Sequence, residues 1–328
     1  MYTALHIAAT CGIPLVLARW FFRQSWLSAP FALLLFFASP RFTGILALAT
    51  FNIASTAYCL AFLSAVPGLT RGKWRWFYVA VFLAATIKIT FLALLMLPVL
   101  AGKRQWRNSI LCGLVVVAAN AMEMVSMPAL YAGYRWSLLQ GIVKEGAYGY
   151  GIFGMVSAYG YKLGIPDPAG AYAAAILLDI VIVTVLLLLH KRAQRLKSQG
   201  IWLALVVTAI ILVNPRELQY DVDISLLSAF VLWVYVLRIR RLLGLLTLMV
   251  VLFIPTFIVP LFVKAIHQHG LYGTLETIIV FGLACWRLWK ETERTQHQAV
   301  AGGVLDTPAP EVGDRAVSDR VMLEGLSC

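Results

Sequence analysis

The segment Asn214–Asp223 (NPRELQYDVD) holds the densest group of residues that could do chemistry. Arg216 can bind two phosphate oxygens at once, and Tyr220 can contact a substrate beside it. Asp221 or Asp223 could act as the general base that removes a proton from a hydroxyl group. The alternative is a polar turn in which Asp223 caps the next helix. A cap explains one acid but not the remaining charges, so we favour a functional site with Asp221 as the better candidate base.

Three more charged residues lie inside apolar runs, where charges are rare and usually functional or paired: Lys88, Glu123 and Asp179. Helical rise puts Lys88 about 18 Å from one basic flank and Glu123 about 10 Å from the opposite boundary. These two residues could therefore lie at similar depth. A contact between them would be a structural ion pair or the substrate-binding wall of an outward cavity. Asp179 could instead be protonated in a helix interface.

The segment Gly146–Gly164 mixes glycines with tyrosines and phenylalanine. Its backbone amides could approach a phosphate and its rings could stack on a sugar. The simpler interpretation is tyrosines that anchor at the membrane interface and glycines that form turns between short surface helices. The cysteines and histidines elsewhere lack the spacing of metal ligands. We therefore expect neither a metal centre nor a cofactor.

The elements that position these residues must be membrane helices, because 61% of the 328 residues are hydrophobic and only 13% are charged. This balance excludes a soluble enzyme, a nucleic-acid binder and a secreted disulfide scaffold. Clear apolar runs cover Leu5–Phe22, Ser109–Leu130, Ala169–Leu189, Ile201–Val213, Ile224–Leu237, Leu242–Val263 and Leu271–Leu288. We expect an all-α polytopic membrane protein with roughly 8–10 transmembrane helices, including short half-helices.

The net charge of +12 comes from short Lys and Arg clusters between the apolar runs. The positive-inside rule places these clusters in the cytoplasm. Trp76–Ala101 has such clusters at both ends, so we expect a hairpin of two half-length helices that meet near Lys88, in preference to one full span. Tyr131–Pro168 and Asn214–Asp223 then face outward. The orientation of the first forty residues stays open, because Arg41 fits neither scheme.

The composition changes abruptly after residue 290 to a polar sequence that contains Pro and Gly. It predicts an integral membrane helical domain over residues 1–290 and a disordered cytoplasmic tail over residues 291–328.

The lysine segment and its basic flank (AATIKITFLALLMLPVLAGKRQWR) resemble the GT-C superfamily of membrane glycosyltransferases, in its bacterial polyprenol-phosphate-mannose-dependent branch. In that branch an Ile-Lys-Pro turn precedes an apolar half-helix and an arginine-rich loop. Here Lys88 takes the lysine position, and Ile89 replaces the proline. NPRELQYDVD is similar to the polar turn before a late helix, and Asn52 in FNIAS matches one residue of a G-Q-x-N motif. The resemblance covers roughly residues 30–290.

One feature of that family has no counterpart. GT-C enzymes carry an essential acidic residue in the first outward loop, whereas residues 23–30 contain no Asp or Glu and the first acid of the chain is Glu123. The chain therefore resembles a member without this loop: a truncated product, a partner-dependent half, or a divergent enzyme with other acids. The catalytic acid of the family corresponds to no position here.

The resemblance implies a multi-pass enzyme of the cell (inner) membrane. It would move a mannose-like sugar from a polyprenyl-phosphate donor to a lipid or glycan acceptor on the outer face. Lys88 and Arg216 would hold the donor phosphate, and Asp221 or Asp223 would deprotonate the acceptor. The alternatives are a transporter or flippase for a lipid-linked or polar substrate, and a non-catalytic relative. The expected partners are donor, acceptor and membrane lipids, without nucleic acid.

Overall fold

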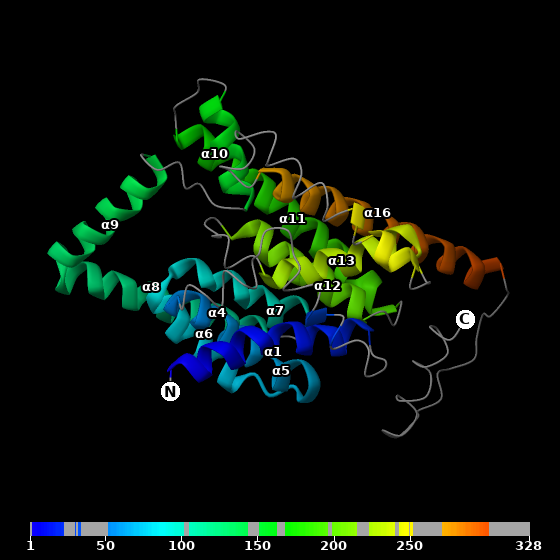
Figure 1. The fold of residues 1–328 in the computed structure, drawn as a ribbon, viewed down its shortest axis with the longest axis horizontal. Helices are drawn as coiled ribbons and strands as arrows, with labels where there is room; N and C mark the ends of the chain where they lie inside the picture. Colours follow the sequence, from blue (N-terminus) through cyan, green and yellow to red (C-terminus); the bar gives the residue numbers. More distant parts are fainter. Residues whose placement is uncertain are drawn as a thin grey trace. The chain divides into compact units, whose positions relative to one another are not determined.

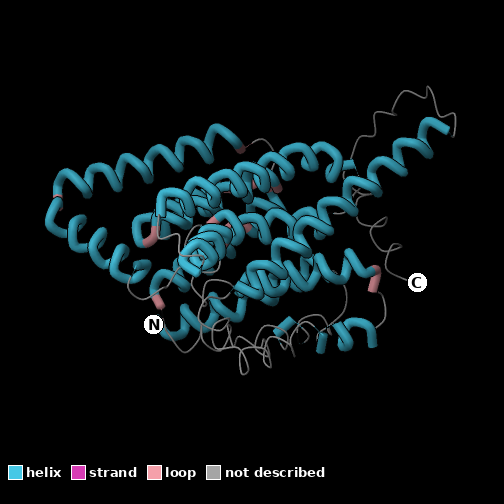
Figure 2. The backbone as a smooth tube through the Cα atoms, turned by 90° about the horizontal axis from the view of Figure 1, so that it is seen from above, coloured by secondary structure: helices cyan, strands magenta, loops and turns pink. Residues whose placement is uncertain are grey.

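The computed structural model describes residues 2–22, 30, 32–33, 52–101, 105–143, 151–162, 168–195, 199–214, 223–239, 243–248, 250–251 and 271–301. Every regular element in these ranges is helical (Figures 1 and 2). In chain order the elements are α1 (Tyr2–Phe22), α4 (Ile53–Leu63), α5 (Val66–Arg71), α6 (Arg75–Ile87), the 3₁₀-helix η1 (Ile89–Leu95), α7 (Met96–Leu100), α8 (Trp106–Ser126), α9 (Pro128–Val143), α10 (Ile152–Lys162), α11 (Pro168–Arg195), α12 (Gln199–Val213), α13 (Asp223–Leu237) and α16 (Leu271–Ala301). The chain divides into two compact units, Met1–Trp289 and Lys290–Cys328.

Four of the described helical segments are long and apolar enough to cross a membrane: Tyr2–Arg19, Ile53–Arg71, Trp106–Ser126 and Tyr172–Ala193. Shorter apolar helices cover Arg75–Ile87, Ile89–Leu100, Gly200–Val213 and Leu227–Leu237. α8 and α11 expose large apolar side chains, such as Leu114 (61%) and Leu177 (63%), which suits a surface that faces lipid. The all-α polytopic membrane class predicted from the sequence is confirmed.

α12 is the central helix of the first unit. Its residues from Trp202 to Leu212 are buried on every side, as expected for a helix that is apolar all round. It contacts α1, α7, η1, α10, α11 and α13. Two hydrogen bonds complete this packing: Thr208 donates to the hydroxyl of Ser228 at 3.1 Å, and the indole of Trp202 donates to the carbonyl of Leu100 at 2.8 Å.

The expected lysine hairpin is present. α6 ends at Ile87, Lys88 has an extended backbone (φ −147°, ψ 103°), and η1 begins at the next residue. The hydroxyl of Tyr78 donates to the carbonyl of Gln105 at 3.4 Å and lies 3.2 Å from the hydroxyl of Ser109. The hairpin thus runs from Tyr78 to its turn at Lys88 and then back, so that Gln105 and Ser109 lie beside Tyr78. The return half differs from a simple half-helix, since η1 precedes the short α7.

Proline shifts the end of the next predicted span. The apolar run to Leu130 predicts one helix, but α8 ends at Ser126 and α9 begins at Pro128. Proline disfavours a helical conformation for the residue before it and has no amide to donate to the preceding turn. The two helices therefore meet at a sharp bend, visible at the end of α8 in Figure 1.

The C-terminal helix extends further than the composition predicts. α16 continues to Ala301, so the first residues of the segment expected to be disordered are helical. Glu, Arg, Gln and Ala are good helix formers, which accounts for this extension. Residues 302–328 lie outside the described residues. Nearer its start, α16 is tied to the end of α13, because Arg287 donates to the carbonyls of Tyr235 and Val236.

Candidate functional site

Gly151 of the segment Gly146–Gly164 meets Asn214, the first residue of NPRELQYDVD, at the end of α12. Asn214, directly after this helix, is fully buried. Gly151, directly before α10, approaches it so closely that an added Cβ atom would lie 2.3 Å from the carbonyl oxygen of Asn214. Only a residue without a side chain fits this approach. The absence of a side chain at Gly151 therefore lets the start of α10 pack against Asn214, where NPRELQYDVD begins.

Lys88 is half-buried at the turn of the hairpin. Its ammonium group lies 5.2 Å from the centroid of the Phe91 ring, within the range of a cation–π interaction. Phe91 is fully buried and stacks on Tyr58 of α4, with 4.8 Å between the ring centroids. Two buried aromatic rings thus fix the wall on which the lysine rests, and they connect the hairpin to α4.

A buried polar cluster joins the start of α1 to the start of α4. The hydroxyl oxygen of Thr56 lies 2.6 Å from the Nδ1 atom of His6 and 3.1 Å from the hydroxyl oxygen of Tyr2. The Thr56 hydroxyl also contacts the carbonyl of Asn52 at 2.9 Å. His6 is fully buried. The cluster therefore places a titratable ring among hydroxyl groups inside an apolar bundle.

Asn52 has a defined structural role in this cluster. Its side-chain oxygen accepts hydrogen bonds from the amides of Ala54 (2.8 Å) and Ser55 (3.3 Å), which makes it the N-cap of α4. Tyr58, which supports Phe91 and Lys88, lies half a turn beyond Thr56 on the same helix. The first turns of α4 thus connect the His6 cluster to the lysine hairpin.

This cluster was not among the sites predicted from the sequence, although residue spacing carries a signal for it. Tyr2 and His6 are four residues apart, as are Asn52 and Thr56, so each pair shares a helix face. Polar pairs on the faces of apolar helices indicate a buried partner. Which two faces meet depends on packing between segments fifty residues apart, and the spacing does not reveal it.

The structure describes only part of the predicted site. Glu123 is exposed on α8, and the described residues show no ion pair between it and Lys88. Asp179 is half-buried on α11, and its Oδ1 atom has no hydrogen-bond partner. α13 begins at Asp223, but the predicted positions Arg216, Tyr220 and Asp221 lie outside the described residues.

The described His, Cys, Asp and Glu residues nowhere form a group of three that could hold a metal ion. The polar groups described so far lie in three separate places: half-buried Lys88 at the hairpin, buried His6 with its hydroxyl partners at α1 and α4, and the backbone of Gly151 and Asn214 at the end of α12. Of these groups, the half-buried Lys88 can bind an anion through its positive charge.

Comparison with known proteins identifies one family. The family model described as Glycosyltransferase family 87 matches residues 1–215, about two thirds of the chain. No curated protein and no solved structure matches the chain.

Proposed function

Since the chain belongs to glycosyltransferase family 87, we propose that it moves a mannose-like sugar from a polyprenyl-phosphate donor to a lipid or glycan acceptor. The reaction would take place at the outer face of the cell (inner) membrane. Family membership favours this enzyme over the transporter that the charge pattern also allowed, and it makes the chain a membrane glycosyltransferase. The match over residues 1–215 is the single observation that carries the proposal.

The positions of basic residues at helix ends support a site on the outer side of the membrane. Arg19 lies near the end of α1, Arg71 ends α5, and Arg238 follows α13, so the positive-inside rule directs these three ends to the cytoplasm. α4 and α5 together form the apolar span Ile53–Arg71. The opposite ends of these three spans hold the His6 cluster, at the starts of α1 and α4, and the start of α13 at Asp223. All of them would then face outward.

The lengths of two antiparallel segments put Lys88 at the same outer level. α7 and η1 both contact α12, and Leu100 accepts a hydrogen bond from Trp202. From Leu100 back to Lys88 the return half rises about 21 Å, while α12 rises about 18 Å from Trp202 to Asn214. We therefore infer that Lys88 lies near the level of Asn214, where the polar turn begins.

The proposed chemistry assigns one role to each residue. The acceptor hydroxyl attacks the anomeric carbon of the sugar, and the bond from this carbon to the phosphate oxygen breaks. Asp221 takes the hydroxyl proton, while the polyprenyl phosphate leaves with the bonding electrons. Lys88 and Arg216 stabilise the negative charge of that phosphate. Asp223 serves as a second candidate base at the start of α13, and Tyr220 and Glu123 stay candidate substrate contacts.

Two substitutions in the polar turn test this assignment. Asp221→Asn should abolish sugar transfer but leave donor binding intact, because the amide cannot accept the proton. Arg216→Ala should weaken donor binding itself. The assay uses the full chain in proteoliposomes, with radiolabelled polyprenyl-phosphate mannose as donor and lipids extracted from the producing cells as acceptors. Donor binding is measured separately by filter retention.

Glu217→Gln is the matched control, because it removes one acid from the same turn without touching an assigned role. Its transfer rate should stay within about twofold of the unmodified chain. Small and equal effects of all three substitutions would mean that the turn is only structural.

A further inference from the structure

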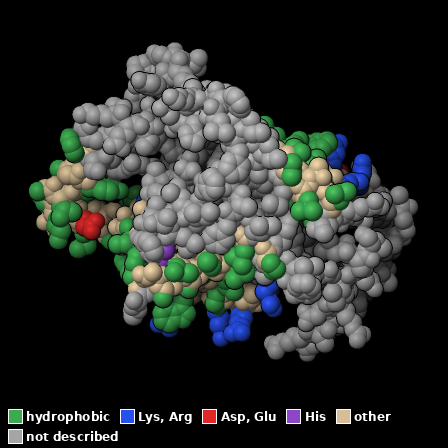
Figure 3. Space-filling model, viewed as in Figure 1, with side chains coloured by type: hydrophobic (Ala, Val, Ile, Leu, Met, Phe, Trp, Pro, Cys, Tyr) green, Lys and Arg blue, Asp and Glu red, His purple; other side chains and the backbone are tan. Residues whose placement is uncertain are grey.

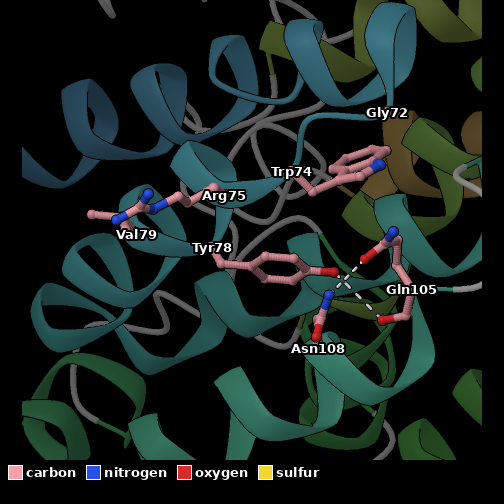
Figure 4. A pocket seen from close by; sticks show the side chains of 7 residues that line it. All are labelled: Gly72, Trp74, Arg75, Tyr78, Val79, Gln105 and Asn108. Carbon is pink, nitrogen blue, oxygen red and sulfur yellow. Dashed lines mark hydrogen bonds between the residues drawn. The ribbon is translucent and has the colours of Figure 1, made fainter.

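A pocket lies at the opposite end of the hairpin from Lys88, where α5 ends and α6 and α8 begin. Its volume is about 450 Å³. Figure 4 shows the side chains that line it: Trp74 and Arg75 at the start of α6, Tyr78 one turn later, and Gln105 and Asn108 at the start of α8. None of the lining residues is acidic. The proposed glycosyl transfer uses none of them.

The indole of Trp74 forms a rigid wall of this pocket. Gly72 directly follows α5, and its left-handed backbone (φ 69°) reverses the chain toward Trp74. Trp74 is 4% exposed and packs edge-on against Phe77. An added Cβ atom on Gly68 would lie 2.4 Å from the indole, so the glycine leaves room for the ring. This wall is therefore formed before any ligand binds.

A hydrogen-bonded polar wall stands opposite. The Tyr78 hydroxyl donates to the backbone carbonyl of Gln105, and the side-chain amide of Asn108 donates to the side-chain oxygen of Gln105 at 2.8 Å (Figure 4). The Tyr78 hydroxyl also contacts the hydroxyl of Ser109. These contacts orient the amide and phenol groups that border the pocket. An oriented Asn108 amide keeps a second N–H that can donate to a ligand.

The surroundings of the pocket are strongly cationic. Its exposed charged neighbours among the described residues are Arg71, Lys73, Arg75 and Arg107. α6 and α8 both begin here without an acidic residue in the first turn or a side-chain cap, so their positive ends add to the potential. Figure 3 shows Lys and Arg side chains gathered at the lower edge of the molecule, in the region of α5. An anion is the complementary ligand.

Two exposed tryptophans mark the membrane interface at this level. Trp76 is 69% exposed and follows Arg75, which lines the pocket. Trp106 is 49% exposed and follows Gln105, which also lines it. Exposed tryptophans of membrane proteins concentrate where lipid headgroups lie. The pocket is thus at the depth of the headgroups.

An apolar stripe leads from the pocket along α6. Val79, Leu83 and Ile87 follow Arg75 at intervals of four residues, so all four share one helix face. The three apolar side chains are 43%, 57% and 46% exposed. A ligand with a charged head at Arg75 and an acyl chain along this stripe would satisfy both parts of the surface. A free phosphate would use only the first part.

We propose that this pocket binds the phosphate headgroup of an anionic phospholipid. Arg75 pairs with the phosphate, Asn108 donates to the headgroup oxygens, and one acyl chain lies along Val79, Leu83 and Ile87. Basic pockets between helices at the cytoplasmic interface are suited to such headgroups. The site is separate from the proposed catalytic site and does not depend on its activity.

Lipid titration of the delipidated full chain tests the proposal. Dioctanoyl phosphatidylglycerol, dioctanoyl phosphatidylcholine and inorganic phosphate are added in a nonionic detergent, and Kd is taken from the shift in apparent melting temperature. Phosphatidylglycerol should bind at least tenfold more tightly than the other two. Arg75→Gln should weaken its binding about fivefold, as expected for one cation near an anionic lipid.

Two further variants separate the parts of the site. Leu83→Ser should weaken phosphatidylglycerol binding but leave the response to inorganic phosphate unchanged. Lys191→Gln removes an exposed charge from α11 and should change Kd less than twofold. The proposal is overturned if Arg75→Gln and Lys191→Gln have equal effects, or if inorganic phosphate protects as well as the anionic lipid. All three positions are exposed, so the variants should fold.

Discussion

Replacing Gly151 with alanine tests its close contact with the backbone of Asn214, the first residue of NPRELQYDVD. The new Cβ atom would lie 2.3 Å from the carbonyl oxygen of Asn214 and 3.3 Å from that of Leu212, whereas ordinary contacts begin at 3.4 Å. The two segments must therefore separate by about 1 Å at Asn214. Both crowded atoms belong to the backbone, so no side-chain rotation relieves the clash.

The expected loss of stability follows from this overlap. Gly151 is buried, and among the described residues the only positive-φ glycine is Gly72, so alanine at 151 meets a steric clash and no backbone strain. Overpacking of this kind typically costs about 1–3 kcal/mol. Each kcal/mol lowers the melting temperature of a large chain by about 2–4 °C. Gly151→Ala should therefore lower it by several degrees.

Gly133→Ala on α9 is the matched control, because an added Cβ atom there meets nothing within 4 Å. Its melting temperature should stay unchanged or rise slightly, since alanine favours a helix. The assay is the fraction of detergent-solubilised chain that stays monodisperse after heating. Sugar transfer below both melting temperatures should fall only in Gly151→Ala, which displaces the start of the polar turn. Identical melting curves for the two variants would refute the close approach.

Three other predictions concern the fold and its orientation. Asn52→Ala should cost about 0.5–2 kcal/mol by removing the α4 cap, while Asn52→Ser should restore most of it, as chemical denaturation can measure. Trp202→Phe should cost about 1–3 kcal/mol, because the buried Leu100 carbonyl loses its donor; a stability equal to the parent chain would contradict this hydrogen bond. In a cysteine-free background, cysteine at Gln219 should react with an impermeant maleimide added outside, and cysteine at Thr295 should not. The reverse pattern would overturn the proposed orientation.

The amino-acid sequence was sufficient to predict properties that depend on composition and on the position of a residue along a helix. Apolar run lengths predicted the all-α membrane class, and basic residues at both ends of Trp76–Ala101 predicted the hairpin with its turn at Lys88. These predictions succeed because lipid accepts only backbone that is hydrogen-bonded internally and because a charge must stay near water. The helical extension to Ala301 was missed, since polar composition does not exclude a helix that continues from an apolar one.

The candidate site shows that the depth of a residue along its helix does not determine which residue it contacts. Similar depth suggested that Lys88 would pair with Glu123, but Lys88 rests on Phe91 and Glu123 is exposed. Depth along a helix says nothing about rotation around its axis, and rotation selects the neighbour.

Only the tertiary structure placed His6 against Thr56, Gly151 against Asn214 and Tyr78 against Gln105. Each contact joins segments at least twenty-seven residues apart. Local periodicity identifies the face of a helix that is buried, but the partner of that face depends on how all the helices pack together. The class of this protein was thus readable from its residues one segment at a time, whereas its polar clusters exist only once those segments have packed.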